Sequence, residues 1–170
     1  IDPLLTLSVP PKATAATGID ALCHAIESFT SVKATTLTEY YGLEAIRLIG
    51  ANLRTAYCNG SDIKAREALS KASFFAAISM GNAGSNAVHA LGYPLQGQHR
   101  VPHGLACSVM LPAVMEFNAI GNMEKFSAVA QALGENVQGL SLREAAFKCA
   151  KACKELCKDV GIPEHISELG

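Results

Sequence analysis

An aspartate and a histidine one helical turn apart are the first residues in this chain that could carry out chemistry. Asp20 and His24 are separated by four positions, which would place both side chains on one face of a helix. A carboxylate and an imidazole in this arrangement can hold one metal ion. A hydrogen bond between the two side chains within the helix is a common alternative. The spacing alone therefore leaves both interpretations open.

A second group of histidines strengthens the metal interpretation. His89, His99 and His103 lie within 15 residues and make up three of the five histidines in the chain. Neutral imidazoles combined with a carboxylate suit Fe(II), Zn(II) and related first-row ions. The spacing does not choose between His99 and His103, although Pro102 is expected to start a helix and to leave His99 outside it. A lone buried histidine is usually a hydrogen-bonded core residue, but three of them favour a metal site.

The segment that carries these histidines is almost free of charge. Between Ala72 and Met115 the only Asp, Glu, Lys or Arg is Arg100. A helix facing water would not run this far without charge, so the segment is expected to be largely buried. Each buried polar group without a partner costs about 1–3 kcal/mol. We therefore expect a hydrogen-bonded network or a ligand around its polar residues, which are Asn82, Asn86, His89, Gln96, His99 and His103.

The elements that must position these residues are predicted to be helices. Apolar residues recur at spacings of three and four, and no alternating strand pattern is present. Start and stop signals, such as Asn59-Gly60 and the capping-box pair Ser141 and Glu144, separate the helices. The chain is therefore predicted to be a single all-α, helical bundle-like domain over residues 1–170. Its helices are expected at about 11–31, 36–58, from 61 or 62 onward, 122–133 and 141–160.

Composition excludes several classes of function. The chain has 14 Lys plus Arg and 15 Asp plus Glu, a net charge of −1, which argues against nucleic acid or an anionic membrane as the main partner. No stretch approaches the ~18 uninterrupted apolar residues of a membrane span. The start at Ile1 lacks the basic region of a signal peptide. With 49% hydrophobic residues, the chain is expected to be folded rather than disordered.

The six cysteines include no C-x-x-C pair. Cys149, Cys153 and Cys157 are four residues apart, which places them on one helical face. We expect them to act as small buried hydrophobic residues rather than as a metal or redox site. Nothing in this pattern requires an oxidising compartment, so the chain is assigned to the cytoplasm.

Two longer motifs resemble a known family. Residues 17–27 read TGIDALCHAIE, which resembles the T-G-x-D-A-L-x-H-A-x-E motif of the iron-containing, group III alcohol dehydrogenases. Residues 87–106 resemble the second signature of that family, two histidines separated by 13 residues with P-H-G near the end. The likeness runs from Asp2-Pro3 to Gly161-Ile162-Pro163. Two long motifs in the right order make it specific.

The resemblance implies a metal-dependent alcohol dehydrogenase. The metal ligands of the family match Asp20, His24, His89 and His103, a choice that selects His103 over His99. Fe²⁺ is the implied ion, with Zn²⁺ and Ni²⁺ as alternatives. The metal would polarise the oxygen of a small alcohol or aldehyde, and hydride would pass to or from NAD or NADP.

The resemblance also suggests residues that assist the reaction. Many family members have a histidine at position 93, whereas this chain has Tyr93, whose phenol could still form a hydrogen bond. His99 is a candidate substitute. Asn82, Asn86 and Gln96, together with Tyr93, are candidates for supporting the ligands.

The chain also lacks features of the family. Family members are roughly twice as long and begin with an α/β nucleotide-binding domain, whose glycine-rich phosphate loop has no counterpart here. The chain also ends before the family's final helices. It therefore resembles the helical metal-binding domain alone, or a truncated form that is inactive in isolation and able to form homo-oligomers. Alternatives are a non-catalytic metal-binding or oligomerisation module, and a relative of glycerol dehydrogenase or dehydroquinate synthase.

Overall fold

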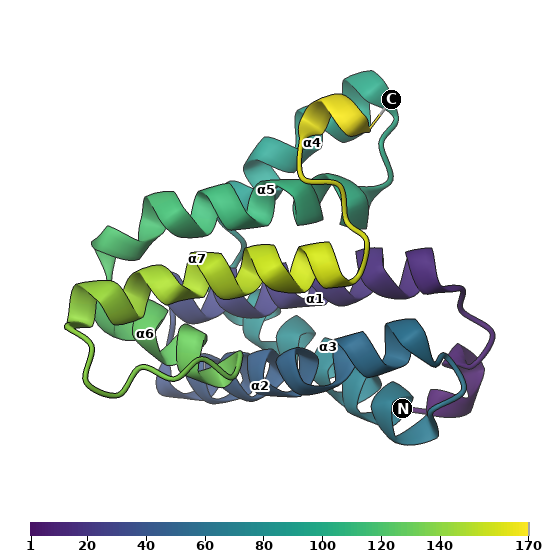
Figure 1. Cartoon of the computed structure of the whole chain (residues 1–170), viewed down its shortest axis with the longest axis horizontal. Helices are drawn as coiled ribbons and strands as arrows, with labels where there is room; N and C mark the ends of the chain where they lie inside the picture. The colour runs from purple at the N-terminus through teal and green to yellow at the C-terminus, as the bar shows by residue number, and fades with distance from the viewer. Residues whose placement is uncertain (170) are drawn as a thin grey trace.

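The computed structural model describes residues 1–169, and within them the chain consists of helices and connecting turns with no β-strand. Figure 1 shows the seven α-helices. In chain order they are α1 (Pro11–Thr30), α2 (Thr36–Cys58), α3 (Ile63–Ala83), α4 (Ala87–His99), α5 (His103–Asn118), α6 (Met123–Ala132) and α7 (Leu142–Asp159). Short 3-10 turns are Pro3–Thr6, Ala119–Gly121 and Ile166–Glu168. The all-α prediction is confirmed.

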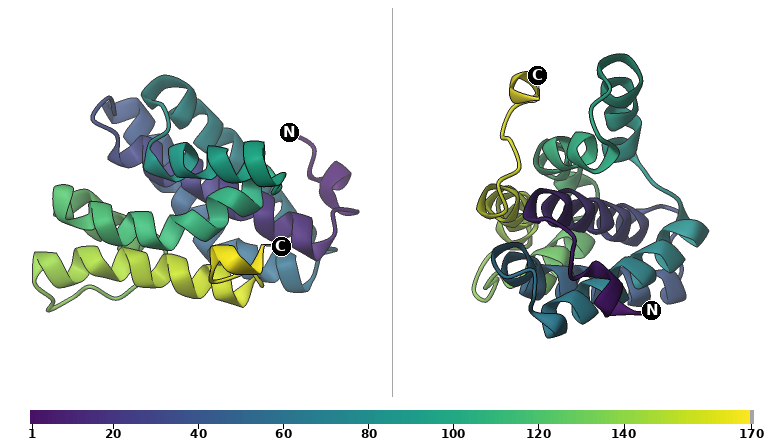
Figure 2. Two further views of the ribbon diagram at one scale, coloured as in Figure 1. Left: turned by 90° about the horizontal axis from the view of Figure 1, so that it is seen from above. Right: turned by 90° about the vertical axis from the view of Figure 1, so that its right-hand side faces the viewer.

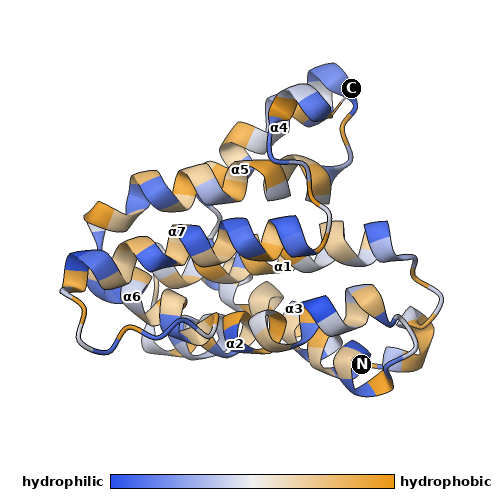
Figure 3. Ribbon diagram, viewed as in Figure 1, coloured by the Kyte–Doolittle hydropathy of each residue, from blue (hydrophilic) through white to orange (hydrophobic). Residues whose placement is uncertain are grey.

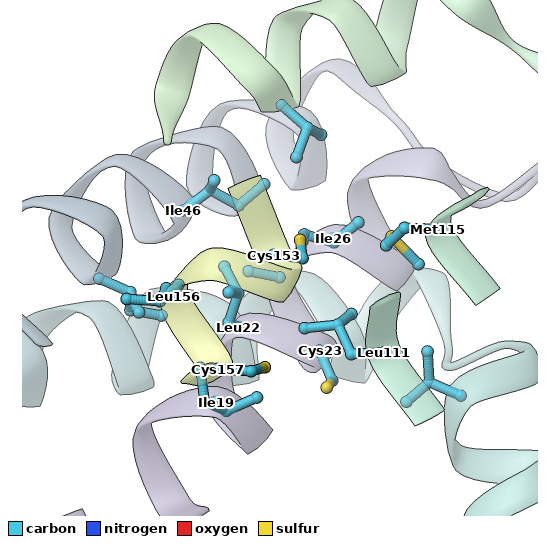
Figure 4. Close-up of a cluster of buried hydrophobic side chains, with 14 of the residues drawn as sticks. Ile19, Leu22, Cys23, Ile26, Ile46, Leu111, Met115, Cys153, Leu156 and Cys157 are labelled. Atoms are coloured by element: carbon cyan, nitrogen blue, oxygen red, sulfur yellow. The ribbon is translucent and has the colours of Figure 1, made fainter. Parts of the chain in front are cut away.

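Helix α1 is the central element of the bundle. It contacts α2, α3, α4, α5 and α6, and the end-on view in Figure 2 shows the other helices arranged around it. Ile19, Leu22 and Ile26 of this helix are completely buried. Figure 4 shows them packed among Ile46 of α2, Leu111 and Met115 of α5, and Cys153, Leu156 and Cys157 of α7. A central helix surrounded in this way is a fixed platform for any polar residue that it carries.

Most of the predicted helix boundaries are confirmed, because local capping signals set them. Asp62 accepts a hydrogen bond from the backbone amide of Ala65 at the start of α3, and Asn122 accepts one from the backbone amide of Lys125 at the start of α6. Ser141 and Glu144 form the predicted capping box of α7. Pro102 immediately precedes α5, so His99 lies outside that helix, as expected. The sequence did not delimit α4.

The expectation that residues 72–115 are largely buried is wrong in part. Phe74, Leu91 and Tyr93 are each at least half exposed. The segment spans the second half of α3, all of α4 and most of α5. Helices α3 and α4 each pack on the bundle through one side, with Ala72, Ala76, Val88 and His89 among the buried positions. The lack of charge therefore extends onto the surface, and Figure 3 shows hydrophobic residues along α4 and α5.

The cysteines of α7 behave as predicted. Cys149, Cys153 and Cys157 are buried among apolar side chains, and all six cysteines of the chain are free thiols. These three residues therefore contribute to packing between α7 and the rest of the core.

The segment His103–Gly121 has the length and apolar composition of a helix that could cross a membrane, although Glu116 interrupts it. In the structure this segment packs against α1, α4 and α7. The core helix of a soluble protein has the same composition, so length and composition alone are weak evidence for a membrane span.

The turn between α4 and α5 determines where their histidines lie. Arg100 takes up a left-handed conformation with φ of 55°, and the amides of Arg100 and Val101 bond back to the last carbonyls of α4. Gly104 then allows α5 to approach α1, because a Cβ at this position would lie 2.6 Å from the carbonyl oxygen of Ala16. The close approach places the first turn of α5 beside the polar face of α1.

Candidate metal centre

Helix α1 presents three ionisable side chains at successive turns of one face. Asp20, His24 and Glu27 occupy positions i, i+4 and i+7, which lie on one stripe of a helix. Glu27 is buried, whereas Asp20 and His24 are partly exposed. An apolar core would not hold three such groups without partners from other helices.

Helices α4 and α5 supply those partners. The Nε2 atom of His89 lies 3.7 Å from Asp20 Oδ1, and the Nε2 atom of His103 lies 3.4 Å from the same oxygen. Together with the sulfur of Cys107, the donor atoms of these residues all lie within 4.8 Å of one another. Residues from three helices, separated by up to 87 positions in the sequence, therefore lie together at one point.

The unpaired atoms of this cluster fit a bound metal ion. Asp20 Oδ1 and His89 Nε2 are both buried, and neither has a hydrogen-bond partner among residues 1–169. Leaving such groups unsatisfied costs about 1–3 kcal/mol each, and native structures rarely tolerate it. Both atoms are metal donors, and they face each other at a separation too long for a hydrogen bond. A divalent cation between them would satisfy both, so the residues present are chemically suited to hold one.

Glu27 fixes the orientation of His89. The Oε2 atom of its carboxylate lies 2.5 Å from His89 Nδ1, and Oε1 accepts a hydrogen bond of 2.7 Å from the backbone amide of Val88. A carboxylate offers only acceptors, so Nδ1 of His89 must carry the proton. The Nε2 atom is then the one with a free lone pair, and it points to Asp20. Such a carboxylate–histidine pair is the usual support of a metal-ligating imidazole.

Gln96 supports His103 in the same way. Its Oε1 atom lies 2.9 Å from His103 Nδ1, so the amide oxygen accepts the proton of that nitrogen. The Nε2 atom of His103 is then left with its lone pair directed to Asp20 Oδ1. His103 is the most exposed of the clustered groups, with 41% of its side chain accessible. The cluster is therefore open to solvent on the α5 side.

Burial and partners change the proton affinity of the two imidazoles in opposite directions. The pKa of His89 is raised, first because of its hydrogen bond with Glu27. The pKa of His24 is lowered, first because burial disfavours the imidazolium. His24 is therefore neutral at physiological pH, which is the state that a metal ligand requires.

The position of His24 differs from that of the other three predicted ligands. Its Nε2 atom lies 3.8 Å from Asp20 Oδ2, and its ring stacks on that of His89 with centroids 4.7 Å apart. It is not one of the four residues whose donor atoms all lie within 4.8 Å of one another. The structure therefore brings Asp20, His89 and His103 together, and His24 borders them.

The residues expected to assist are more scattered. Tyr93 lies one turn after His89 on α4 and is 57% exposed. His99 ends α4 and is exposed, ten residues from His89, which is about 15 Å along a helix. Asn86 donates to the carbonyl of Glu27. Asn82 donates a hydrogen bond to the carbonyl of Ile78 in its own helix, and within residues 1–169 no hydrogen bond joins it to the cluster.

Two residues of the cluster were missed from the sequence. Glu27 closes the first motif, but its partner is 62 residues away and no local spacing connects them. Cys107 follows His103 by four positions, the same spacing that drew attention to Asp20 and His24. This spacing could have identified Cys107 from the sequence, but buried cysteines usually act as packing residues, so it was not considered as a ligand.

A hollow of about 440 Å³ lies between α5 and α7, and none of the clustered side chains lines it.

Comparison with known proteins identifies the relatives of this chain. Residues 14–170 match the model of the Fe-containing alcohol dehydrogenase family, C-terminal part. The chain is 45% identical to a 1,3-propanediol dehydrogenase of Klebsiella pneumoniae over 99% of its own length and 44% of that protein. It is 39% identical to an NAD-dependent methanol dehydrogenase of Bacillus methanolicus, over 100% of this chain and 45% of that one.

Solved structures agree with this grouping. A 1,3-propanediol oxidoreductase superposes with a TM-score of 0.98 at 45% identity, covering 99% of this chain and 44% of that one. The chain thus spans less than half the length of the relatives that it matches.

Proposed function

Because this chain belongs to the iron-containing alcohol dehydrogenase family, we propose that it binds one divalent metal ion through Asp20, His24, His89 and His103. We further propose that it serves, within a longer protein, the interconversion of a small alcohol and its aldehyde. The observation that carries the proposal is the pair of buried donor atoms Asp20 Oδ1 and His89 Nε2, which have no partner among residues 1–169. Both atoms belong to the cluster of Asp20, His89, His103 and Cys107. The bound ion would supply Lewis acidity towards an alcohol or carbonyl oxygen.

The chain's own residues prepare the site for this ion. Glu27 holds the Nδ1 proton of His89, and Gln96 holds that of His103, so both rings keep a lone pair on Nε2. Neither imidazole has to change tautomer when the ion arrives. Because Asp20 and His24 share one turn of the central helix, their relative positions are fixed by the packing of α1.

The open side of the site is where a substrate would enter. His103 is exposed there, and the neighbouring surface of α4 carries Leu91 and Tyr93. A largely uncharged surface favours a short alcohol or aldehyde over a charged substrate. Tyr93 lies on the same face of α4 as His89, so its phenol is better placed than His99 for hydrogen bonding to a substrate. His99 is displaced along the helix.

The remaining parts of the proposal concern the longer protein. Hydride transfer requires a nicotinamide, and the NAD-dependent methanol dehydrogenase among the relatives supports NAD as the acceptor. We take residues 1–170 to form one helical metal-binding domain, with the nucleotide held by another part of the protein. The six free thiols favour a cytoplasmic location. The exposed apolar residues of α3 and α4 are consistent with association with another domain or another copy.

Metal content of two matched histidine variants tests the proposal. His89→Ala should remove most of the bound metal, because it deletes a donor at the centre of the cluster. His165→Ala should retain it, because His165 is exposed and lies outside the cluster. Metal bound by the native state should also raise the melting temperature of the wild type by mass action. Equal metal content in the two folded variants would refute the ligand assignment.

A further inference from the structure

The thiol of Cys107 is the donor of the cluster that the proposed ligand set does not use. Its sulfur lies 4.0 Å from His103 Nε2 and belongs to the group of donors within 4.8 Å of one another. The residue is completely buried. It follows His103 by one turn of α5, so both side chains project from the same face of that helix.

The surroundings of this thiol differ from those of the cysteines on α7. All four of these cysteines belong to the apolar core, but among residues 1–169 Cys149, Cys153 and Cys157 take part in no group of metal donors. Cys107 instead lies beside Asp20 Oδ1 and His89 Nε2, which are buried and unpartnered. The sulfur also packs against Gly92 of α4, where a Cβ would lie 3.4 Å from it. Cys107 is therefore both a core residue and a neighbour of the unpartnered donor atoms.

We propose that Cys107 adds a sulfur donor to the metal site and biases this chain towards Zn²⁺ over Fe²⁺. The inference rests on the metal site of the proposed function and extends its ligand set. Imidazole and carboxylate donors alone suit non-haem Fe(II), whereas a thiolate added to nitrogen and oxygen donors favours zinc. On binding, the S–H bond breaks, its proton passes to solvent and a metal–sulfur bond forms, with no change of oxidation state.

Cobalt(II) is the probe that reports sulfur ligation directly. The purified chain, stripped of metal and reloaded with Co²⁺, should show the intense near-ultraviolet charge-transfer band of a thiolate–cobalt bond. Cys107→Ser should bind Co²⁺ without this band. Cys153→Ser, which makes the same atomic change at an equally buried position on α7, should keep it. The ratio of Zn²⁺ to Fe²⁺ affinity should fall roughly tenfold or more in Cys107→Ser, by comparison with the effect of losing a supporting residue.

A second measurement needs no variant and is independent of folding defects. X-ray absorption of the zinc-loaded wild type should show one sulfur neighbour at about 2.3 Å. A cobalt-loaded wild type without the charge-transfer band, or a band that persists unchanged in Cys107→Ser, would overturn the inference and leave the proposed metal site intact. Failure of the wild type to bind any divalent ion would instead overturn the proposed function itself.

Discussion

The replacement Glu27→Gln tests whether Glu27 of α1 orients His89 of α4 for binding a metal ion. Glu27 is buried, and its two carboxylate oxygens are used by His89 Nδ1 at 2.5 Å and Val88 N at 2.7 Å. Glutamine has the same shape but presents an NH₂ group in place of one oxygen. If its remaining oxygen stays on Val88, two donors meet at His89, and the imidazole must move its proton to Nε2. That nitrogen is the one that faces Asp20.

Two magnitudes follow from this geometry. Loss of a hydrogen bond to a charged group costs about 1.5–3 kcal/mol, which should appear as reduced stability of the metal-free protein. Loss of the support behind a metal-ligating histidine costs roughly 10–100-fold in metal affinity, where each factor of ten corresponds to about 1.4 kcal/mol. The affinity loss is the specific signature, because a residue that only packs would lower stability without changing the binding of metal to the folded chain.

The assay separates these two effects. Zinc affinity is measured at pH 7.5 by competition with a chromophoric chelator, and stability is measured by urea denaturation in the presence of a chelator that keeps the protein metal-free. Glu44→Gln is the control, since Glu44 pairs with Arg47 on the exposed face of α2, and it should change neither quantity appreciably. A folded Glu27→Gln chain with zinc affinity within twofold of wild type would refute the argument that Glu27 orients His89 for a metal.

Three further predictions concern the approach of α5, the protons of the site and the isolated chain. Gly104→Ala should lower the free energy of unfolding by about 1–3 kcal/mol and weaken metal binding, because its Cβ would lie 2.6 Å from a backbone oxygen of α1; denaturation and metal titration check this, and wild-type values for both would contradict it. Because the pKa of His89 is raised above its usual 6.5, protons should begin to compete with the metal for His89 while the pH is still above 6.5. A plot of log apparent metal affinity against pH should therefore become steeper as the pH falls through this range, and an unchanged slope down to pH 6 would contradict the prediction. The chain alone, loaded with metal, should not oxidise short alcohols with NAD or NADP, because nothing in the sequence resembles a phosphate loop to hold the nucleotide; sustained turnover or micromolar nucleotide binding by calorimetry would show that the cofactor site lies within these residues.

The sequence by itself determined the local part of this protein. Helix boundaries follow from residues that cap their own backbone, such as Asp62 before α3 and Ser141 with Glu144 before α7. The pairing of Asp20 with His24 is equally local, since a spacing of four on any helix places two side chains together. These features depend on hydrogen bonds and distances within a few residues, which the order of the amino acids specifies directly.

Only the tertiary structure decided which residues meet across helices. Spacing alone did not choose between His99 and His103, and it was the family resemblance that selected His103. The physical reason lies in the structure, where the left-handed turn at Arg100 and the close approach at Gly104 bring His103 to Asp20, while His99 is exposed. The contact between Glu27 and His89 joins residues 62 positions apart. The exposure of Phe74 and Tyr93 depends likewise on which side of each helix the bundle covers. Such contacts arise from the packing of whole helices, and this packing depends on all their buried faces at once rather than on any local pattern.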